Sequence, residues 1–174
     1  TLITDVLGGS ITFSVILNGS TQDQSAELSE TMRLSLDYAN NSSESIEDIS
    51  FDLTITTPDG TEPIHWSQAN LGGGTRTGNE INWSNLDDLE PDDSGVIDLS
   101  LPIFPQIDEG EADQFTINVT LTLNKVGDIS STRTLESTPI TVSLNSDTDI
   151  SALARYYSQS GSAIGTGPLP PEVG

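Results

Sequence analysis

The sequence contains no cysteine, few basic residues and few aromatic ones. Five lysines and arginines stand against 27 aspartates and glutamates, which gives a formal net charge of −22 over 174 residues. Without cysteine the fold cannot depend on disulfides, and no thiolate can act as a nucleophile or metal ligand. So large an acidic excess argues against binding to nucleic acid, which requires a basic face.

Long apolar runs are missing as well. No stretch approaches the roughly 18 consecutive apolar residues that a membrane-spanning helix requires. We therefore expect no direct membrane insertion of this segment, and the acidic charge also disfavours adhesion to anionic lipid.

The apolar residues that are present alternate with polar ones. Hydrophobic residues make up 33% of the chain, which is low, but their period of two is typical of half-buried β-strands. The pattern is clearest in residues 11–17, 32–38, 49–55, 97–103, 115–123 and 140–144. No stretch has a convincing helical period. The sequence therefore predicts an all-β fold, an immunoglobulin-like Greek-key β-sandwich of about seven strands.

The stretch 79–104 organises this prediction. Ile81 and Trp83 lead into the acidic turn EPDDSG, where Pro91 and Gly95 supply turn conformations, and a cleanly alternating strand follows. We expect a β-arch or a hairpin here. Its apolar face should share one core with the neighbouring strands, formed by Trp83, Leu99, Leu101, Ile117, Val119 and Leu121.

The C-terminal part has a different composition. We predict a sandwich over residues 1–145, while residues 146–174 begin with the linker-like NSDTD and end as a Pro/Gly-rich extended strand or linker. The segment ISALARYY predicts one strand without a partner strand after it. This tail should open a next module or act as a donor strand between subunits, through Leu153, Tyr156 and Tyr157.

Several motifs together resemble the tandem immunoglobulin-like repeats of bacterial and archaeal cell-surface proteins. They are a Tyr-x-Asn turn in LDYANN, a Trp followed by Leu-x-Pro in INWSNLDDLEP, and the ending GPLPPEVG, which resembles the opening of a next repeat. Ser29, before Glu30, and Asp92, after Pro91, stand where those repeats usually have glycine. The resemblance implies a fold and an extracellular, cell-surface setting, but no catalytic residue.

Calcium is the metal that the acidic clusters favour. Five carboxylates fall within one loop, Asp87, Asp88, Glu90, Asp92 and Asp93. Further clusters are Asp108, Glu109, Glu111 and Asp113, and the pair Asp147 and Asp149. Hard oxygen ligands on loops suit Ca²⁺, which takes 6–8 of them. None of the clusters has EF-hand spacing, so a hydrated acidic surface without calcium is the alternative.

Five sequons mark candidate sites for N-linked glycosylation, at Asn18, Asn40, Asn41, Asn82 and Asn118. This number is larger than we expect by chance, and it favours an exported, glycosylated surface.

Other constellations point only weakly to chemistry. A pair of carboxylates at glycosidase spacing is always available among so many acids. His65 has no nucleophile motif around it and no second histidine in the sequence, which argues against a catalytic or metal-binding role. The run Gly72, Gly73 and Gly74 lacks the context of a phosphate-binding loop, so this run predicts a flexible loop.

The sequence is compatible with two functions. The first is a non-enzymatic structural module of a cell-surface assembly, a repeat stalk or filament subunit joined to neighbouring copies or adjacent repeats through β-strand contacts. The alternative is an adhesin that binds carbohydrate or protein through residues 61–78, with Trp66 as an exposed platform. The exposure of Trp66 should distinguish the two.

Overall fold

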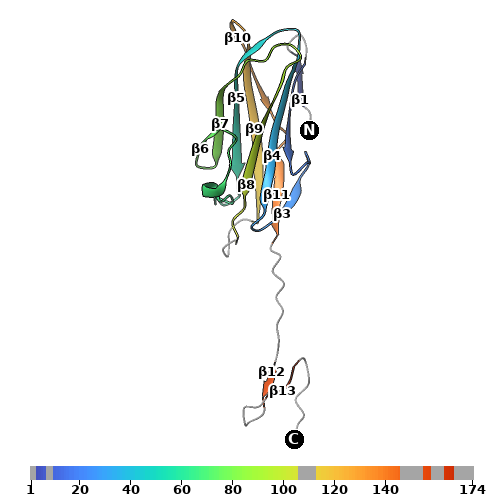
Figure 1. Cartoon of the computed structure of the whole chain (residues 1–174), viewed down its shortest axis with the longest axis vertical. Coiled ribbons are helices and arrows are strands. Elements are labelled where there is room, and N and C mark those ends of the chain that lie inside the picture. The colour runs from blue at the N-terminus through green and yellow to red at the C-terminus, as the bar shows by residue number, and fades with distance from the viewer. Residues whose placement is uncertain (1–2, 7–9, 106–112, 146–154, 158–162, 167–174) are drawn as a thin grey trace.

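Two β-sheets pack face to face in the computed structural model, which describes residues 3–6, 10–105, 113–145, 155–157 and 163–166 (Figure 1). The four-stranded sheet has the order β1 (Ile3–Val6), β2 (Ser10–Leu17), β4 (Thr31–Asn41), β8 (Ser94–Pro102). The seven-stranded sheet has the order β3 (Gln24–Glu27), β11 (Ile140–Asn145), β9 (Gln114–Lys125), β5 (Ile46–Thr56), β7 (Glu80–Leu86), β6 (Thr75–Thr77), and β10 (Asp128–Glu136) also pairs with β9. No helix in the described residues is long and apolar enough to cross a membrane.

The connections between the sheets make the fold a Greek key. The chain passes from β4 in one sheet to β5 in the other, pairs β5 with β7, and returns to the first sheet as β8. It then crosses once more, so that β9 pairs with β5. The structure is therefore an immunoglobulin-like β-sandwich, as predicted. Because β7 and β8 belong to different sheets, the stretch 79–104 is a β-arch and not a hairpin.

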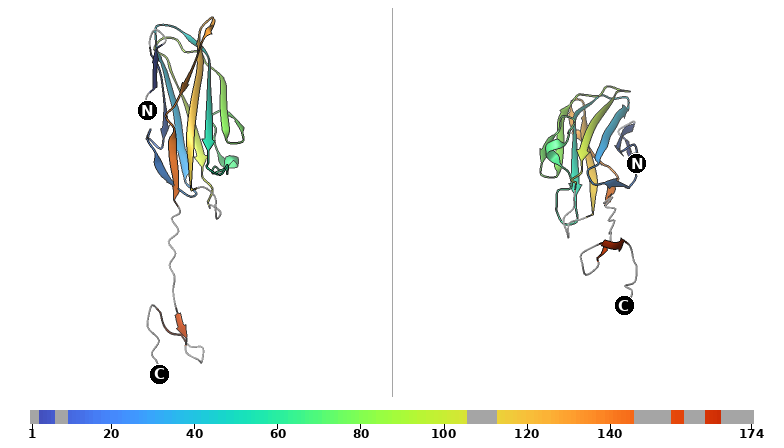
Figure 2. Two further views of the ribbon diagram at one scale, coloured as in Figure 1. Left: turned by 180° about the vertical axis from the view of Figure 1, so that it is seen from behind. Right: turned by 60° about the horizontal axis from the view of Figure 1, so that its bottom comes forward.

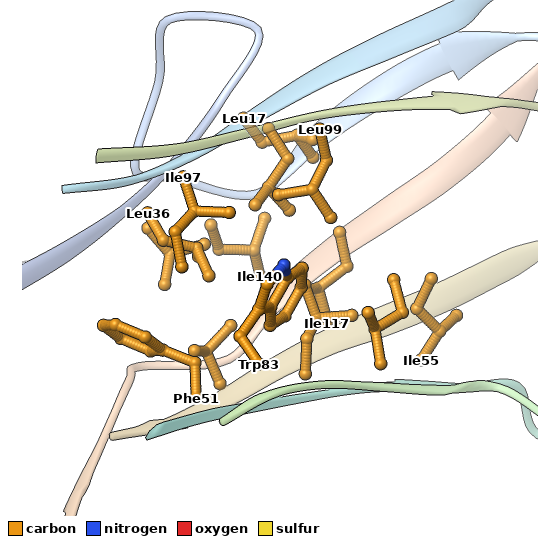
Figure 3. Packing of buried hydrophobic residues seen from close by; sticks show 14 of the residues in the cluster. Leu17, Leu36, Phe51, Ile55, Trp83, Ile97, Leu99, Ile117 and Ile140 are labelled. Carbon is orange, nitrogen blue, oxygen red and sulfur yellow. The ribbon is translucent and has the colours of Figure 1, made fainter. Parts of the chain in front are cut away.

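The core lies between the sheets, where the inward residues of both interdigitate (Figure 3). All six residues predicted to share it are buried, with at most 4% of each side chain exposed. Phe51, on β5, makes edge-to-face contacts with Phe13 on β2 and Tyr38 on β4, with ring centroids 5.9 and 5.1 Å apart. These contacts join the two sheets across the core.

Two strands differ from the prediction because their sequences hardly alternate. β3 lies outside the alternating stretches from which strands were predicted, and only Ala26 of its four residues is buried. β10 also lies outside those stretches, and its register with β9 shifts between Asp128 and Arg133. In both strands the pairing is determined by the neighbouring strand, a tertiary effect that local sequence patterns do not report.

The tail also differs from the prediction. β12 (Arg155–Tyr157) pairs in antiparallel fashion with β13 (Ala163–Thr166), and the two form a separate two-stranded sheet. The expectation that this strand would lack a partner is therefore wrong. Tyr156 and Tyr157 belong to β12, whereas Leu153 lies outside the described residues.

Ser29 and Asp92, which replace the usual glycines of the repeat motifs, both adopt a φ of 69°. This left-handed conformation costs an ordinary L-residue about 1–2 kcal/mol, whereas glycine adopts it freely. Aspartate tolerates it better than serine does, because its short polar side chain can hydrogen-bond locally. The two departures thus keep the turns that glycine would form, at an energetic cost that should be larger for Ser29.

We expect Ser29→Gly to raise the free energy of unfolding by about 0.5–1 kcal/mol, because relief of the left-handed strain exceeds the entropy that glycine adds to the unfolded chain. Asp92→Gly should give a smaller gain. Ser84→Gly, at an exposed position of β7, should destabilise the protein. Urea unfolding curves of the three variants measure these differences, and a loss of stability in Ser29→Gly would contradict the interpretation of this turn.

Candidate functional site

Asn40, at the end of β4, connects two motifs that are far apart in the sequence. Its side chain is fully buried, and Nδ2 donates to the carbonyl oxygens of Glu44, Leu89 and Glu90 at 2.8, 3.0 and 3.2 Å. Its Oδ1 accepts from the backbone N–H and the hydroxyl of Ser42, at 3.0 and 2.6 Å. The asparagine of the Tyr-x-Asn motif thus holds the Leu-x-Pro loop directly.

Backbone bonds complete this junction. Asn40 N donates to Asp93 O at 2.9 Å, and Asp92 N donates to Asn40 O at 2.8 Å. Ile46 and Leu89 exchange two further bonds of 2.9 Å. The loop between β7 and β8 is therefore fixed to the connection between β4 and β5. Both motifs can be recognised in the sequence but their contact cannot, because each pattern describes its own turn alone.

The carboxylates of this acidic loop do not converge. Asp93 Oδ2 accepts from Glu90 N at 3.2 Å, and Glu90 Oε2 accepts from Ser45 Oγ at 2.5 Å. Burial, and secondarily the negative charge of Asp87, raise the pKa of the Tyr38 phenol above its ordinary value. Among the described residues no three acidic or histidine side chains are placed to hold a metal ion. Of the other predicted clusters, Asp108, Glu109, Glu111, Asp147 and Asp149 lie outside the described residues.

The segment 61–74 covers an edge of the sandwich, on the side opposite β1 (Figure 2). It leaves β5, passes along the outer edge of β8 and continues into β6. His65 N donates to Pro102 O at 2.7 Å, and Asn70 exchanges two bonds of 2.9 Å with Ser100. This cover also buries Pro102, at the end of β8. The segment satisfies backbone groups that an edge strand would otherwise expose.

Trp66 belongs to this cover and packs inward. It begins the single turn η1 (Trp66–Gln68), is half-buried against the hydrophobic core, and its Nε1 is buried without a hydrogen-bond partner in the described part of the chain. The guanidinium of Arg76 lies 4.6 Å from the ring centroid and donates to Glu62 at 2.9 Å. Because Arg76 covers one face of the ring and the core takes much of the rest, this geometry argues against an exposed platform for a ligand.

Two of the three glycines in the run of this segment are closely packed, while Gly73 between them has no atom within 4 Å of a Cβ position. A Cβ added to Gly72 would lie 2.6 Å from Asp98 O, and one added to Gly74 would lie 2.6 Å from the Trp83 ring. Trp83 Nε1 donates to Leu71 O at 2.9 Å just before the run. The prediction of a flexible loop is therefore wrong, since glycine is required here for close approach of the backbone.

The sequon residues lie in different environments. Asn40 is excluded as a glycan acceptor in this fold, because its Nδ2 is buried and donates to three carbonyls. Asn18 lies in the turn after β2, and Asn41 is exposed at the end of β4. Asn82 on β7 and Asn118 on β9 lie on the outer face of the seven-stranded sheet, on either side of β5. Glycosylation of these four residues stays a prediction.

Two shallow hollows lie on the outer face of the four-stranded sheet. The larger, of about 440 Å³, lies between Ile16, Arg33 and Asp98, and the smaller, of about 240 Å³, between Ser14, Asp37 and Val96. They follow β4, where small side chains leave the sheet surface uncovered.

No protein-family model and no curated protein match the chain. Among solved structures, the chain is similar to a variant of BcpA, the major pilin subunit of Bacillus cereus, at 10% identity and a TM-score of 0.53 over 77% of this chain and 40% of the pilin. A cohesin of scaffoldin B from Acetivibrio cellulolyticus matches at 15% identity and a TM-score of 0.47, over 76% of this chain and 99% of the cohesin. AvmM, which catalyses macrocyclization in alchivemycin A biosynthesis, matches at 12% identity and a TM-score of 0.46, over 86% of this chain and 99% of AvmM.

These similarities concern the fold. The chain spans about two fifths of the length of the pilin, and at 10% identity the match supports a shared β-sandwich and nothing finer. A sandwich of this kind carries many functions, so the function of this chain has to be argued from its own residues.

We expect Asn40→Ala to lower the free energy of unfolding by about 2 kcal/mol, because a fully buried amide loses its hydrogen bonds, each with a net value of about 0.5–1.5 kcal/mol. Each of the three carbonyl groups keeps one other donor, from Ser42 Oγ, Ile46 N or Asp93 N, which limits the loss. Asn41→Ala, one residue away and exposed, should change it by less than about 0.5 kcal/mol. Chemical denaturation of both variants gives the comparison. Equal effects would show that the Asn40 network does not hold the junction.

The arrangement of the carboxylates in the acidic loop also predicts how the protein responds to calcium. Because the loop carboxylates do not converge, we expect millimolar calcium chloride to raise the melting temperature no more than sodium chloride of equal ionic strength. A larger rise that chelator reverses and that Asp87→Asn with Asp88→Asn abolishes would instead establish calcium binding at this loop.

Proposed function

We propose that the chain is a non-enzymatic structural module of an extracellular, cell-surface assembly, in which copies or adjacent repeats join through β-strand contacts. The observation that carries this proposal is the use of the motif residues. The side chains of these motif residues contact one another or the core. Through these contacts they hold turns and strand edges in place.

Three examples support this. Asn40 holds the acidic loop, and Trp66 closes the edge of β8, as described above. Glu30, in the motif before β4, accepts from Glu27 N at 2.9 Å with one carboxylate oxygen and from Asn18 Nδ2 at 3.1 Å with the other. A catalytic or ligand-binding site requires convergent polar groups that are free to act on a bound molecule. These polar groups are instead engaged within the fold, which favours a structural role over an enzyme.

The surface fits the proposed setting. A net charge of −22 keeps such a module hydrated and separates it from like-charged neighbours except where specific contacts form. Asn82 and Asn118 present their sequons on one sheet face, which supports a glycosylated exterior. The sandwich is also similar in fold to a major pilin subunit, although this similarity shows no shared function.

The division of the chain belongs to the same proposal. Residues 1–145 form the structural module, and residues 146–174 join it to a neighbour, either as the opening of a next module or as a segment that adds to another subunit. The separate sheet of β12 and β13 supports this division, because these strands pair with each other and with neither large sheet. The alternative of an adhesin that uses Trp66 receives no support from its packed geometry.

Deleting residues 146–174 should leave a folded monomer that no longer assembles. The sandwich keeps its core without the tail, whereas the contact between copies is lost. Sedimentation velocity and thermal unfolding of the full and shortened chains measure the two effects separately. A shortened chain that unfolds would show the tail to be part of the sandwich, and one that assembles like the full chain would remove the tail from the assembly.

A further inference from the structure

Strand β8 has one edge that faces away from β4, and its backbone groups can be assigned. Ser100 exchanges both of its backbone bonds with Asn70, so the N–H and C=O of Ser100 point away from β4. The register between β4 and β8 runs without a shift from Thr31 to Ala39. In an antiparallel ladder the direction alternates along the strand. The N–H and C=O of Ser94, Val96 and Asp98 therefore also point to this outer edge.

The cover over this edge ends partway along the strand. Asn70 bonds Ser100, and Gly72 lies so close to Asp98 O that it leaves no room for a side chain. Beyond that point no described strand pairs with β8, which is the last strand of its sheet. Ser94 and Val96 thus offer four backbone groups in register, two donors and two acceptors, which is the requirement for adding another strand.

The side chains around this open edge add an apolar contact. Val96 is 59% exposed, the largest exposure among the large hydrophobic residues of the described chain. The hollow of about 240 Å³ lies beside it on the outer face of the sheet, next to Gly95 and Ser94. A strand added at this edge would cover Val96 and place side chains of alternate residues over this part of the sheet.

The negative charge around the open edge limits which strands could pair with it. Asp92, Asp93 and Asp98 flank the open edge, so an acidic segment would be repelled. The longest stretch of the chain without a carboxylate side chain lies between Asp149 and Glu172, and it contains Arg155. β12 and β13 both lie within this stretch, with three and four residues, a length that fits the short open edge.

We propose that the open edge of β8, from Ser94 to Ile97, accepts a strand of the β12–β13 hairpin from a second copy of the chain. This inference rests on the proposed function and assigns the surface that receives the tail. Because the donor and the acceptor are different surfaces of the same chain, the contact is head to tail and can propagate from copy to copy.

The test uses full-length protein with the edge altered. Val96→Pro removes the N–H that the added strand would need, without removing a bond to β4, and Val96→Lys places a charge on the edge that repels Arg155. Val126→Lys is the matched control, since Val126 is similarly exposed, at 52%, but lies beyond the end of β9. We expect both Val96 variants to weaken self-association at least tenfold in sedimentation velocity, and the control to associate like the parent.

Val96→Lys keeps the test valid if Val96→Pro fails to fold. If both folded variants associate like the parent while deletion of residues 146–174 abolishes assembly, the proposed docking edge is wrong but the proposed function stands. If the full chain remains monomeric at all concentrations, both proposals are overturned.

A covalent test is available because the chain has no cysteine. Val96→Cys in one copy should form a disulfide with a single cysteine placed in turn at residues 155–157 and 163–166 of another copy. Facing residues of paired strands have Cα atoms about 4.5–5.5 Å apart, which lies within the roughly 4.4–6.8 Å that a disulfide spans. Val126→Cys should form none. Cross-linking equal to that of this control at every position would overturn the proposed pairing.

Discussion

The buried amide of Asn40 is the interaction on which the arrangement of the two sheets depends. β4 and β5 lie in different sheets, as do β7 and β8, so the connections between them determine how the sheets align. Asn40 binds the connection between β4 and β5 and the connection between β7 and β8 with one side chain. Both crossings at this end of the sandwich therefore have a common anchor, and the acidic loop can carry many charges without losing its position.

The sandwich also depends on a cover over its open side, between β7 of one sheet and β8 of the other. The segment 61–74 provides this cover by pairing with β8 and by packing Gly74 against Trp83. Trp66, within this segment, packs inward against the core, and Arg76 covers one face of its ring. The most irregular part of the sequence is thus as constrained as the strands. Its residues resemble those of a ligand-binding loop because close backbone packing also requires glycines and aromatic rings.

The sequence predicted the parts of the fold whose signal is local. Alternation located the strands around Leu36, Phe51, Leu99 and Val119, because inward and outward residues differ in polarity along a single strand. It missed β3 and β10, whose pairing is provided by β11 and β9 and whose residues are mostly polar. For the candidate site it identified the residues but not their contacts. It therefore included Asn40 among the glycosylation candidates, although its amide is buried in this fold, and it left the exposure of Trp66 open.

The parallel pairing of β3 with β11 has a mechanical consequence. Four residues from Gln24 to Glu27 pair in order with Val142 to Asn145, and β11 is the last strand of the sandwich. When β3 is pulled toward its N-terminal end and β11 toward its C-terminal end, parallel strands slide past each other, so their backbone hydrogen bonds bear the load together. An antiparallel hairpin pulled in this way opens one bond at a time. Tension between Gln24 and Asn145 is thus borne in shear, whereas tension from the N-terminal side reaches β1 and β2 first, because these two strands precede β3 in the chain.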